Sequence, residues 1–150
     1  MVFVCSGNTC RSPLAEVYFN KCLRELDVDG VIGRSAGLFA VPGAPASDNS
    51  RLVAEENGCS LEDFSSNNLT AQMVHDAALI LGMTEAHCRK IAAAMPECAG
   101  KIRCLLEFAR GGDVLDPYGG SVDVYRCCFE NMKPALECLA ESLKNGNLLI

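Results

Sequence analysis

Short runs rich in apolar residues alternate along this chain with stretches in which apolar residues recur at helical spacing. The runs fall at residues 1–4, 30–37, 77–83 and 101–106, and each predicts a strand. The third run is apolar throughout, which is typical of an interior strand covered on both faces. Strands that alternate with helices indicate βαβ units, so we expect an α/β fold with a parallel sheet.

Helical spacing predicts four helices around these strands. The first begins with Ser12 as its cap and Pro13 at the first helical position. The second runs from about Asp48 to Asn57, and the third from the cap Thr84 towards Ala94. A Gly- and Asp-rich loop at 111–121 then leads into the last helix, which carries Val124 to Leu143. No repeat or linker interrupts the pattern, so we expect one domain over residues 1–150.

Composition narrows the class of protein. Of the 150 residues, 49% are hydrophobic and 21% charged, as in ordinary globular proteins. The formal net charge of −6 argues against nucleic acid as a partner, because phosphate backbones attract basic surfaces. No apolar stretch approaches the ~18 residues of a membrane span, and the N-terminus lacks the basic region of a signal peptide. We therefore expect a cytoplasmic protein that binds no membrane; the oligomeric state stays open.

Ten cysteines are a high count for this length. A disulfide framework suits short secreted domains that lack a core, whereas many of these cysteines fall in helix-like stretches rich in Leu, Val and Ile. We expect most of them to be small buried residues in a reducing cytoplasm. Zinc is disfavoured because no Cys-x-x-Cys pair occurs, and His75 and His87 lie outside a finger pattern. Both histidines are expected on helix surfaces.

The segment "CSGNTCRSP", residues 5–13, joins the first strand to the first helix. Ligands of open parallel sheets bind beyond the carboxyl ends of the strands, where Cys5 lies. The amides that follow can curl around an anion at the helix N-terminus, and Gly7 and Asn8 tolerate the positive φ of such a curl. Arg11 adds a planar guanidinium that grips two oxygens of a tetrahedral oxyanion. The predicted phosphate-binding residues of the loop are Ser6, Gly7, Asn8, Thr9, Cys10 and Ser12.

The same positive surroundings favour the thiolate form of Cys5. A thiolate beneath a bound phosphoryl group is placed for in-line attack on phosphorus, which gives a thiophosphate enzyme intermediate. The Ser12 hydroxyl can donate to this sulfur and help it leave. The Cys-x5-Arg spacing alone is a weak signal, and its alternative is a buried strand-end cysteine beside a surface arginine. The strand before it, the Gly-Asn within it and the Ser-Pro after it make the signal strong.

A phosphoryl group that leaves oxygen or nitrogen requires a general acid. The candidate is Asp116 in "GGDVLDPYGG", residues 111–120, where Tyr118 is placed to wall the pocket. The same carboxylate would take a proton from water in the second step. Asp113 lies three residues away and is the obvious decoy. Alone, Asp-Pro-Tyr is more typical of a turn with a solvated carboxylate, so this assignment depends on the loop at Cys5.

At this point the chain resembles a known family. "VCSGNTCRSPLAE" (4–16) and "DVLDPYGGSVDVY" (113–125) are similar to segments of the low-molecular-weight protein tyrosine phosphatases, and more closely to their protein-arginine phosphatase branch. "SAGLFA", "NNLT" and "LGMTEAH", between them, also resemble that branch, so the resemblance covers nearly the whole chain. It implies a three-layer fold with a four-stranded parallel sheet flanked by helices. It further implies a phosphorylated protein as substrate, no metal and no organic cofactor.

The resemblance also implies roles for individual residues. Carried onto the matching positions, the catalytic roles fall to Cys5 as nucleophile, Arg11 as phosphate clamp and Asp116 as general acid. Asn8 and Ser35 would brace the loop.

Thr9 is the position that separates the branches. The tyrosine enzymes typically carry isoleucine there, and the arginine phosphatases carry threonine, whose hydroxyl faces a polar guanidinium. A methyl-sized change in a pocket shifts preference by about 1–3 kcal/mol. We therefore expect protein phosphoarginine as substrate, with phosphotyrosine as the alternative; the alternative for Thr9 is a β-branched loop residue without influence on specificity. Phe39 is the candidate for the opposite wall of the pocket.

The family resemblance further suggests a reversible Cys5–Cys10 disulfide that protects the nucleophile from overoxidation. The alternative for Cys10 is a small residue that fits under the start of the helix. The other eight cysteines are assigned to packing or to the surface.

Three rival classes remain. A thioredoxin-coupled arsenate reductase would need two further cysteines to pass a disulfide onward, but the strand-end residue is Met83, and Cys88 with Cys98 lacks the expected spacing. A phosphocarrier domain would need neither Arg11 nor the Asp116 loop. A non-catalytic oxyanion-binding module would be expected to have lost the cysteine or the acid, and the chain retains both.

Overall fold

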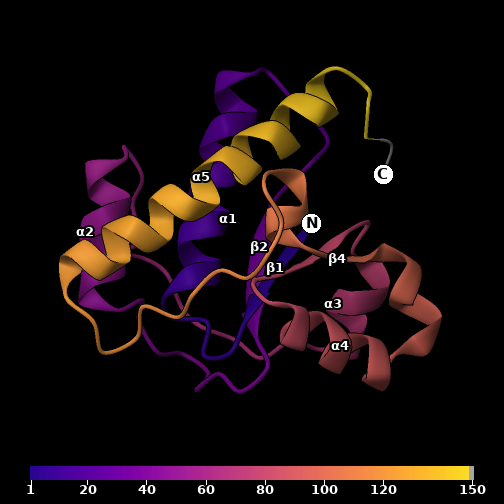
Figure 1. The fold of residues 1–150 in the computed structure, drawn as a ribbon, viewed down its shortest axis with the longest axis horizontal. Helices are drawn as coiled ribbons and strands as arrows, with labels where there is room; N and C mark the ends of the chain where they lie inside the picture. Colours follow the sequence, from indigo (N-terminus) through magenta and orange to yellow (C-terminus); the bar gives the residue numbers. More distant parts are fainter. Residues whose placement is uncertain (149–150) are drawn as a thin grey trace.

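A four-stranded parallel sheet forms the centre of the computed structural model, which describes residues 1–148 (Figure 1). In sequence order the strands are β1 (Val2–Cys5), β2 (Arg34–Gly37), β3 (Ile80–Gly82) and β4 (Ile102–Cys104). Their order across the sheet is β2-β1-β3-β4, and every neighbouring pair is parallel. The carboxyl ends of all four strands therefore lie at one edge, as the alternating pattern predicts.

Helices cover both faces of this sheet, so the fold has three layers (Figure 1). One face carries α1 (Arg11–Glu25), α2 (Asp48–Glu56) and α5 (Val122–Lys144), and the other carries α3 (Ala71–Asp76) and α4 (Glu85–Ala94). Two short 3-10 turns, η1 (Pro96–Lys101) and η2 (Leu105–Phe108), flank β4. Among residues 1–148, no helix combines the length and apolar character required to cross a membrane.

Alternate residues of β1 pack into two separate cores, because successive side chains of a strand point to opposite faces. Phe3 packs with the α1, α2 and α5 layer, where its ring lies edge-on to Phe19 with 5.3 Å between centroids. Val2 and Val4 pack with the α3 and α4 layer. Full burial of each such side chain stabilises the fold by about 1.5–3 kcal/mol. The two cores together fix the end of β1, from which the loop at Cys5 departs.

The start of α1 differs from the prediction that Ser12 caps it. The helix begins at Arg11 with Cys10 in the cap position, and no side chain caps it. Pro13 is consequently the third residue of the helix. The Ser12 hydroxyl lies instead 3.0 Å from the Cys5 sulfur. The first amides of α1 therefore have no side-chain cap to compete with an anion at this helix end.

The strands are shorter than the apolar runs that predicted them. The second was expected from residue 30, but β2 begins at Arg34. The Asn20 side chain accepts from the Gly33 amide at 2.8 Å and donates to the Gly33 carbonyl at 3.0 Å, which occupies the groups that a strand would use. Leu105 and Leu106, expected at the end of the fourth strand, lie in η2. Neither α3 nor η1 was predicted as an element.

The remaining helix boundaries agree with the sequence pattern. The Thr84 hydroxyl accepts from the amide of His87 at 3.2 Å, so the predicted cap of α4 is confirmed. For α2, the Ser47 hydroxyl accepts from the Ser50 amide at 3.3 Å. The Gly- and Asp-rich loop ends at Ser121, immediately before α5.

Candidate active site

The loop between β1 and α1 is held by the buried side chain of Asn8. Asn8 has a positive φ of 54° and is fully buried. Its amide nitrogen donates to the hydroxyls of Ser12 and Ser35, both at 2.9 Å, and its carbonyl oxygen accepts from the Asn67 amide at 2.9 Å. The Ser35 hydroxyl in turn donates to Glu16. One side chain thus joins α1, β2 and the segment before α3 beneath the loop.

Two hydrogen-bonding groups lie close to the Cys5 sulfur, which is buried. The Asn8 amide donates to it at 3.3 Å, and the Ser12 hydroxyl lies 3.0 Å away. The Ser12 hydroxyl accepts from the Asn8 side chain, and its own hydrogen has two acceptors within reach, the Cys5 sulfur at 3.0 Å and the Ala36 carbonyl at 3.5 Å. The two contacts of the sulfur fix its position at the end of β1.

Arg11 connects the loop to a segment more than a hundred residues away. Its guanidinium donates to the Val114 carbonyl at 3.0 Å and forms an ion pair with Asp116, with 3.2 Å between Nη2 and Oδ2. The side chain is almost completely buried. Its Nε has no hydrogen-bond partner within residues 1–148. A buried donor without a partner lowers the stability of the folded protein, so Nε is suited to donate a hydrogen bond to an oxygen of a bound anion.

A pocket of about 240 Å³ brings these groups together. Its lining residues are Cys5, Ser6, Gly7, Thr9, Cys10, Arg11, Asp116 and Tyr118. The fold therefore assembles most of the residues that the sequence proposed for phosphate binding and catalysis. Asn8, Ser12 and Ser35 lie behind the lining, where they hold the loop.

The Asp116 loop is anchored to the sheet by its neighbour Val114. The Val114 amide donates to the Met83 carbonyl at 2.8 Å, just beyond β3, and its side chain is fully buried. Asp116 itself is half exposed and accepts from the Tyr118 amide at 3.2 Å. The decoy Asp113 is used elsewhere, since it accepts from the Glu85 amide at 2.7 Å at the start of α4. Asp116 is therefore the carboxylate of this loop that lines the pocket.

Phe39 was predicted to form the opposite wall of the pocket, but its side chain is found elsewhere. Its amide donates to the Ser6 carbonyl at 2.9 Å, so its backbone borders the loop. Its ring, however, is 70% exposed and does not line the pocket. The Lys90 ammonium lies 4.9 Å from the ring centroid, and this cation–π contact draws the ring over α4.

Cys10 lines the pocket, but its sulfur also contacts the α5 layer. The Cys10 sulfur is 3.3 Å from the Tyr125 hydroxyl and 3.6 Å from the Thr9 hydroxyl. Burial raises the pKa of Tyr125 to about 12, and the bond to Cys10 contributes to this rise. Both Cys5 and Cys10 are free thiols in this structure, and the disulfide between them stays a prediction.

The expectation that His87 lies on a helix surface is wrong. His87 is 6% exposed, and its Nε2 lies 2.9 Å from the Ser6 hydroxyl. His87 is the third residue of α4, which begins after the cap Thr84. In this first turn its side chain is buried against the loop that follows β1, because both segments start at the carboxyl ends of the strands. Desolvation first, then the positive charges of Arg11 and Lys90, lowers the pKa of His87 to about 4.

The fold also brings together residues for which the spacing suggested no site. Ligand atoms of His75, Glu97 and Cys98 lie within 4.8 Å of one another, and this nitrogen, oxygen and sulfur set is the kind that transition metals bind. The side chains of His75 and Glu97 are both more than half exposed. On the same layer, the Cys88 and Cys104 sulfurs lie 3.3 Å apart.

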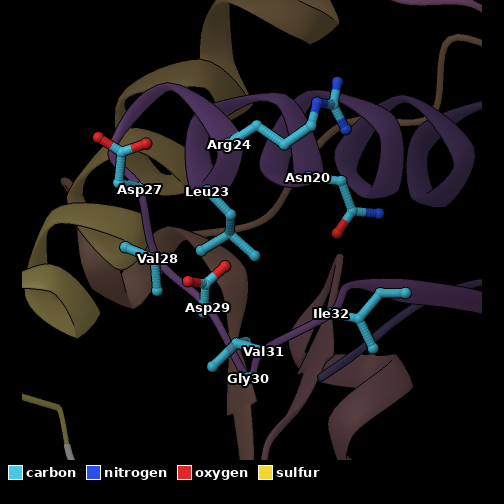
Figure 2. Close-up of a pocket in the computed structure, with 9 residues that line it drawn as sticks. All are labelled: Asn20, Leu23, Arg24, Asp27, Val28, Asp29, Gly30, Val31 and Ile32. Carbon is cyan, nitrogen blue, oxygen red and sulfur yellow. The ribbon is translucent and has the colours of Figure 1, made fainter.

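A larger cavity, of about 490 Å³, lies at the opposite edge of the sheet. Figure 2 shows it between Asn20, Leu23 and Arg24 of α1 and the segment that leads into β2. Its lining residues include no cysteine and no histidine. The smaller pocket at Cys5 therefore holds the chemistry that the sequence pointed to.

Comparison with known proteins adds an independent result. Residues 1–147 match the family described as low molecular weight phosphotyrosine protein phosphatase. The protein-arginine-phosphatase of Bacillus subtilis (strain 168) is 40% identical over 146 residues, which is 96% of each chain. The low molecular weight protein-tyrosine-phosphatase PtpB of Staphylococcus haemolyticus (strain JCSC1435) is 38% identical over 137 residues, 88% of this chain and 91% of its own.

A solved structure shows the same similarity in three dimensions. A YwlE arginine phosphatase mutant with a phosphorylated active-site serine superposes with a TM-score of 0.89 and 37% sequence identity. The match covers 95% of this chain and 94% of the other. The fold is thus shared over nearly the full length of both chains, although fewer than half of the residues are identical.

Proposed function

Because this chain belongs to the low molecular weight phosphotyrosine protein phosphatase family, we propose that it hydrolyses phosphoarginine in proteins through a phosphoryl group carried on Cys5. The observation that carries the proposal is the common pocket of Cys5, Arg11 and Asp116. It contains a nucleophile, a cation for the phosphoryl oxygens and a carboxylate for proton transfer. These are the three groups that hydrolysis through a covalent intermediate requires.

In the first step, the Cys5 thiolate attacks phosphorus in line with the leaving nitrogen. The S–P bond forms and the P–N bond breaks, while Asp116 gives its proton to the departing guanidine nitrogen. Arg11 and the amides of the loop stabilise the charge on the three phosphoryl oxygens. The free Nε of Arg11 and the uncapped start of α1 support this role.

In the second step, water attacks phosphorus and Asp116 takes its proton. The O–P bond forms, the S–P bond breaks and the sulfur leaves as a thiolate. The hydrogen bonds from the Asn8 amide and the Ser12 hydroxyl support the departing charge. The products are arginine and inorganic phosphate, and the site regains its starting protonation.

Arginine specificity is supported by Thr9 and by the relatives. Thr9 lines the pocket with a β-branched side chain that carries a hydroxyl. The proteins named as arginine phosphatases include the relative at 40% identity, while a tyrosine phosphatase follows at 38%. Because the two identities are close, Thr9 supports arginine specificity more strongly than the overall sequence similarity does.

A paired assay tests the proposal. We would measure kcat/KM on a phosphoarginine protein and on a phosphotyrosine peptide with reductant present, and Cys5→Ser serves as the inactive control. A higher kcat/KM on phosphoarginine is expected. A preference for phosphotyrosine would replace the arginine assignment by that of a tyrosine phosphatase, and inactivity on both substrates would contradict the hydrolase assignment.

We also propose that residues 1–150 act as one catalytic domain in the cytoplasm. The helices on both faces of the sheet pack against the strands that carry the site. A free thiol nucleophile and ten cysteines without a disulfide suit a reducing compartment.

A further inference from the structure

Ser6, the first residue of the loop after Cys5, is held from two sides. On one side its carbonyl accepts from the Phe39 amide at 2.9 Å. The approach is close, because a Cβ at Gly37 would lie 2.7 Å from the Ser6 carbonyl oxygen. On the other side its hydroxyl lies 2.9 Å from His87 Nε2. Ser6 also lines the pocket, so these contacts bear directly on the site.

The His87 ring is itself fixed in place. Its amide donates to the Thr84 hydroxyl at 3.2 Å, which sets the first turn of α4 after β3. Within residues 1–148, its Nδ1 is buried without a hydrogen-bond partner. The contact with Ser6 is therefore the hydrogen bond through which the described part of the protein orients this ring.

The charges around the ring keep it neutral at physiological pH. Burial is the largest cause of its lowered pKa, about 4, and Arg11 from α1 and Lys90 from α4 lower it further. Asp113 and Asp116, from the loop before α5, act in the opposite direction with smaller effect. A neutral ring adds no charge to an anion site and offers one nitrogen as donor and one as acceptor.

We propose that His87 is a positioning residue of the phosphate-binding loop, which it orients through its hydrogen bond to the Ser6 hydroxyl. The inference rests on the proposed function, since it assigns His87 a part in the same anion site. Correct placement of Ser6 sets the direction of the amides that follow it. Loss of this hydrogen bond therefore lowers the affinity for the oxyanion, whereas the roles of Cys5 as nucleophile and Asp116 as proton donor are unchanged.

The test is the affinity of the full chain for inorganic phosphate, measured by calorimetry, beside kcat and KM. His87→Leu removes the hydrogen bond, and His87→Gln can restore it, because the Gln amide nitrogen extends to about the place of Nε2. We expect His87→Leu to weaken phosphate binding about fivefold and to raise KM by a similar factor, with kcat within twofold. His87→Gln should recover most of this loss. His75→Leu is the matched control, on the exposed surface of α3, and should change nothing.

Ser6→Ala removes the same hydrogen bond from the loop side. The double variant with His87→Leu should bind phosphate no more weakly than the weaker single variant, because both remove one interaction. Additive losses, or unchanged phosphate affinity in His87→Leu, would overturn the proposal. If His87→Leu fails to fold, Ser6→Ala and His87→Gln carry the test, and unchanged phosphate affinity in Ser6→Ala would equally overturn it.

Phosphate binding is measured without turnover, so the two hypotheses fail separately. A wild-type protein that binds phosphate but does not hydrolyse phosphoarginine contradicts the proposed function. The phosphate affinities of the variants then decide the role of His87 on their own.

Discussion

Arg11 and Asp116 form an ion pair of 3.2 Å that joins the first residue of α1 to the loop before α5. The arginine is buried and the carboxylate half exposed, so the cation is fixed while the carboxylate can reach a substrate. The pair links the proposed phosphate clamp to the proposed proton donor, and it bridges segments that are 105 positions apart in the chain.

Replacement of the nucleophile should separate binding from turnover. Cys5→Ser is expected to lower kcat by on the order of 10⁴ or more, because a serine hydroxyl is a far weaker nucleophile than a cysteine sulfur. The loop and Arg11 remain, so calorimetry should still detect phosphate binding. Turnover close to that of the wild type would refute the assignment of Cys5.

The general acid should matter more for oxygen than for nitrogen leaving groups. Since the P–N bond is acid-labile, we expect Asp116→Ala to lower kcat/KM about 100-fold on phosphotyrosine and no more than about tenfold on phosphoarginine. Asp113→Ala is the matched control, which loses a hydrogen bond to α4 worth about 1 kcal/mol of stability but keeps activity. Equal losses of Asp116→Ala on both substrates would count against the leaving-group argument.

Two substitutions at Thr9 separate its hydroxyl from its size. Thr9→Ile should shift the ratio of kcat/KM for phosphoarginine over phosphotyrosine by about 10- to 100-fold towards tyrosine. Thr9→Val keeps the shape and removes the hydroxyl, so it should lower arginine activity without a gain on tyrosine. An unchanged ratio in Thr9→Ile would leave Thr9 without a role in specificity.

The buried His87 should make stability depend on pH. Its pKa is about 4 in the folded protein against an ordinary 6.5, so between these values the unfolded chain binds more protons. Stability from this group is therefore present above about pH 6.5 and is lost as pH falls towards 4, by roughly 1–3 kcal/mol. Urea unfolding of wild type and His87→Gln from pH 7 to 4.5 should show a shallower loss for the variant. Identical slopes would contradict the burial of a neutral ring.

Much of the site could be predicted because its residues lie close together in sequence. The strand, the cysteine, the Gly-Asn pair and the arginine fall within residues 2–11, and local geometry alone brings them around one anion. Asp116 is far from this segment in sequence, and its assignment came from the need for a general acid and from the family resemblance.

Three of the failures have a common physical cause, which is competition from hydrogen-bonding partners that the local sequence pattern does not reveal. Ser12 has the side chain of a helix cap, but Asn8 and the Cys5 sulfur hold its hydroxyl. The run at residues 30–33 has the composition of a strand, but Asn20 takes the hydrogen bonds of Gly33. His87 lies in a polar stretch that favours the surface, and only the fold places it beneath Ser6.

The position of β1 has a consequence for how the protein fluctuates. Because β1 pairs with β2 on one side and β3 on the other, its amides are expected to exchange with solvent only when the whole molecule opens. Cys5 is the last residue of that strand. The reactive sulfur is thus attached to backbone that is hydrogen-bonded on both sides, and it keeps its place as long as the centre of the sheet stays intact.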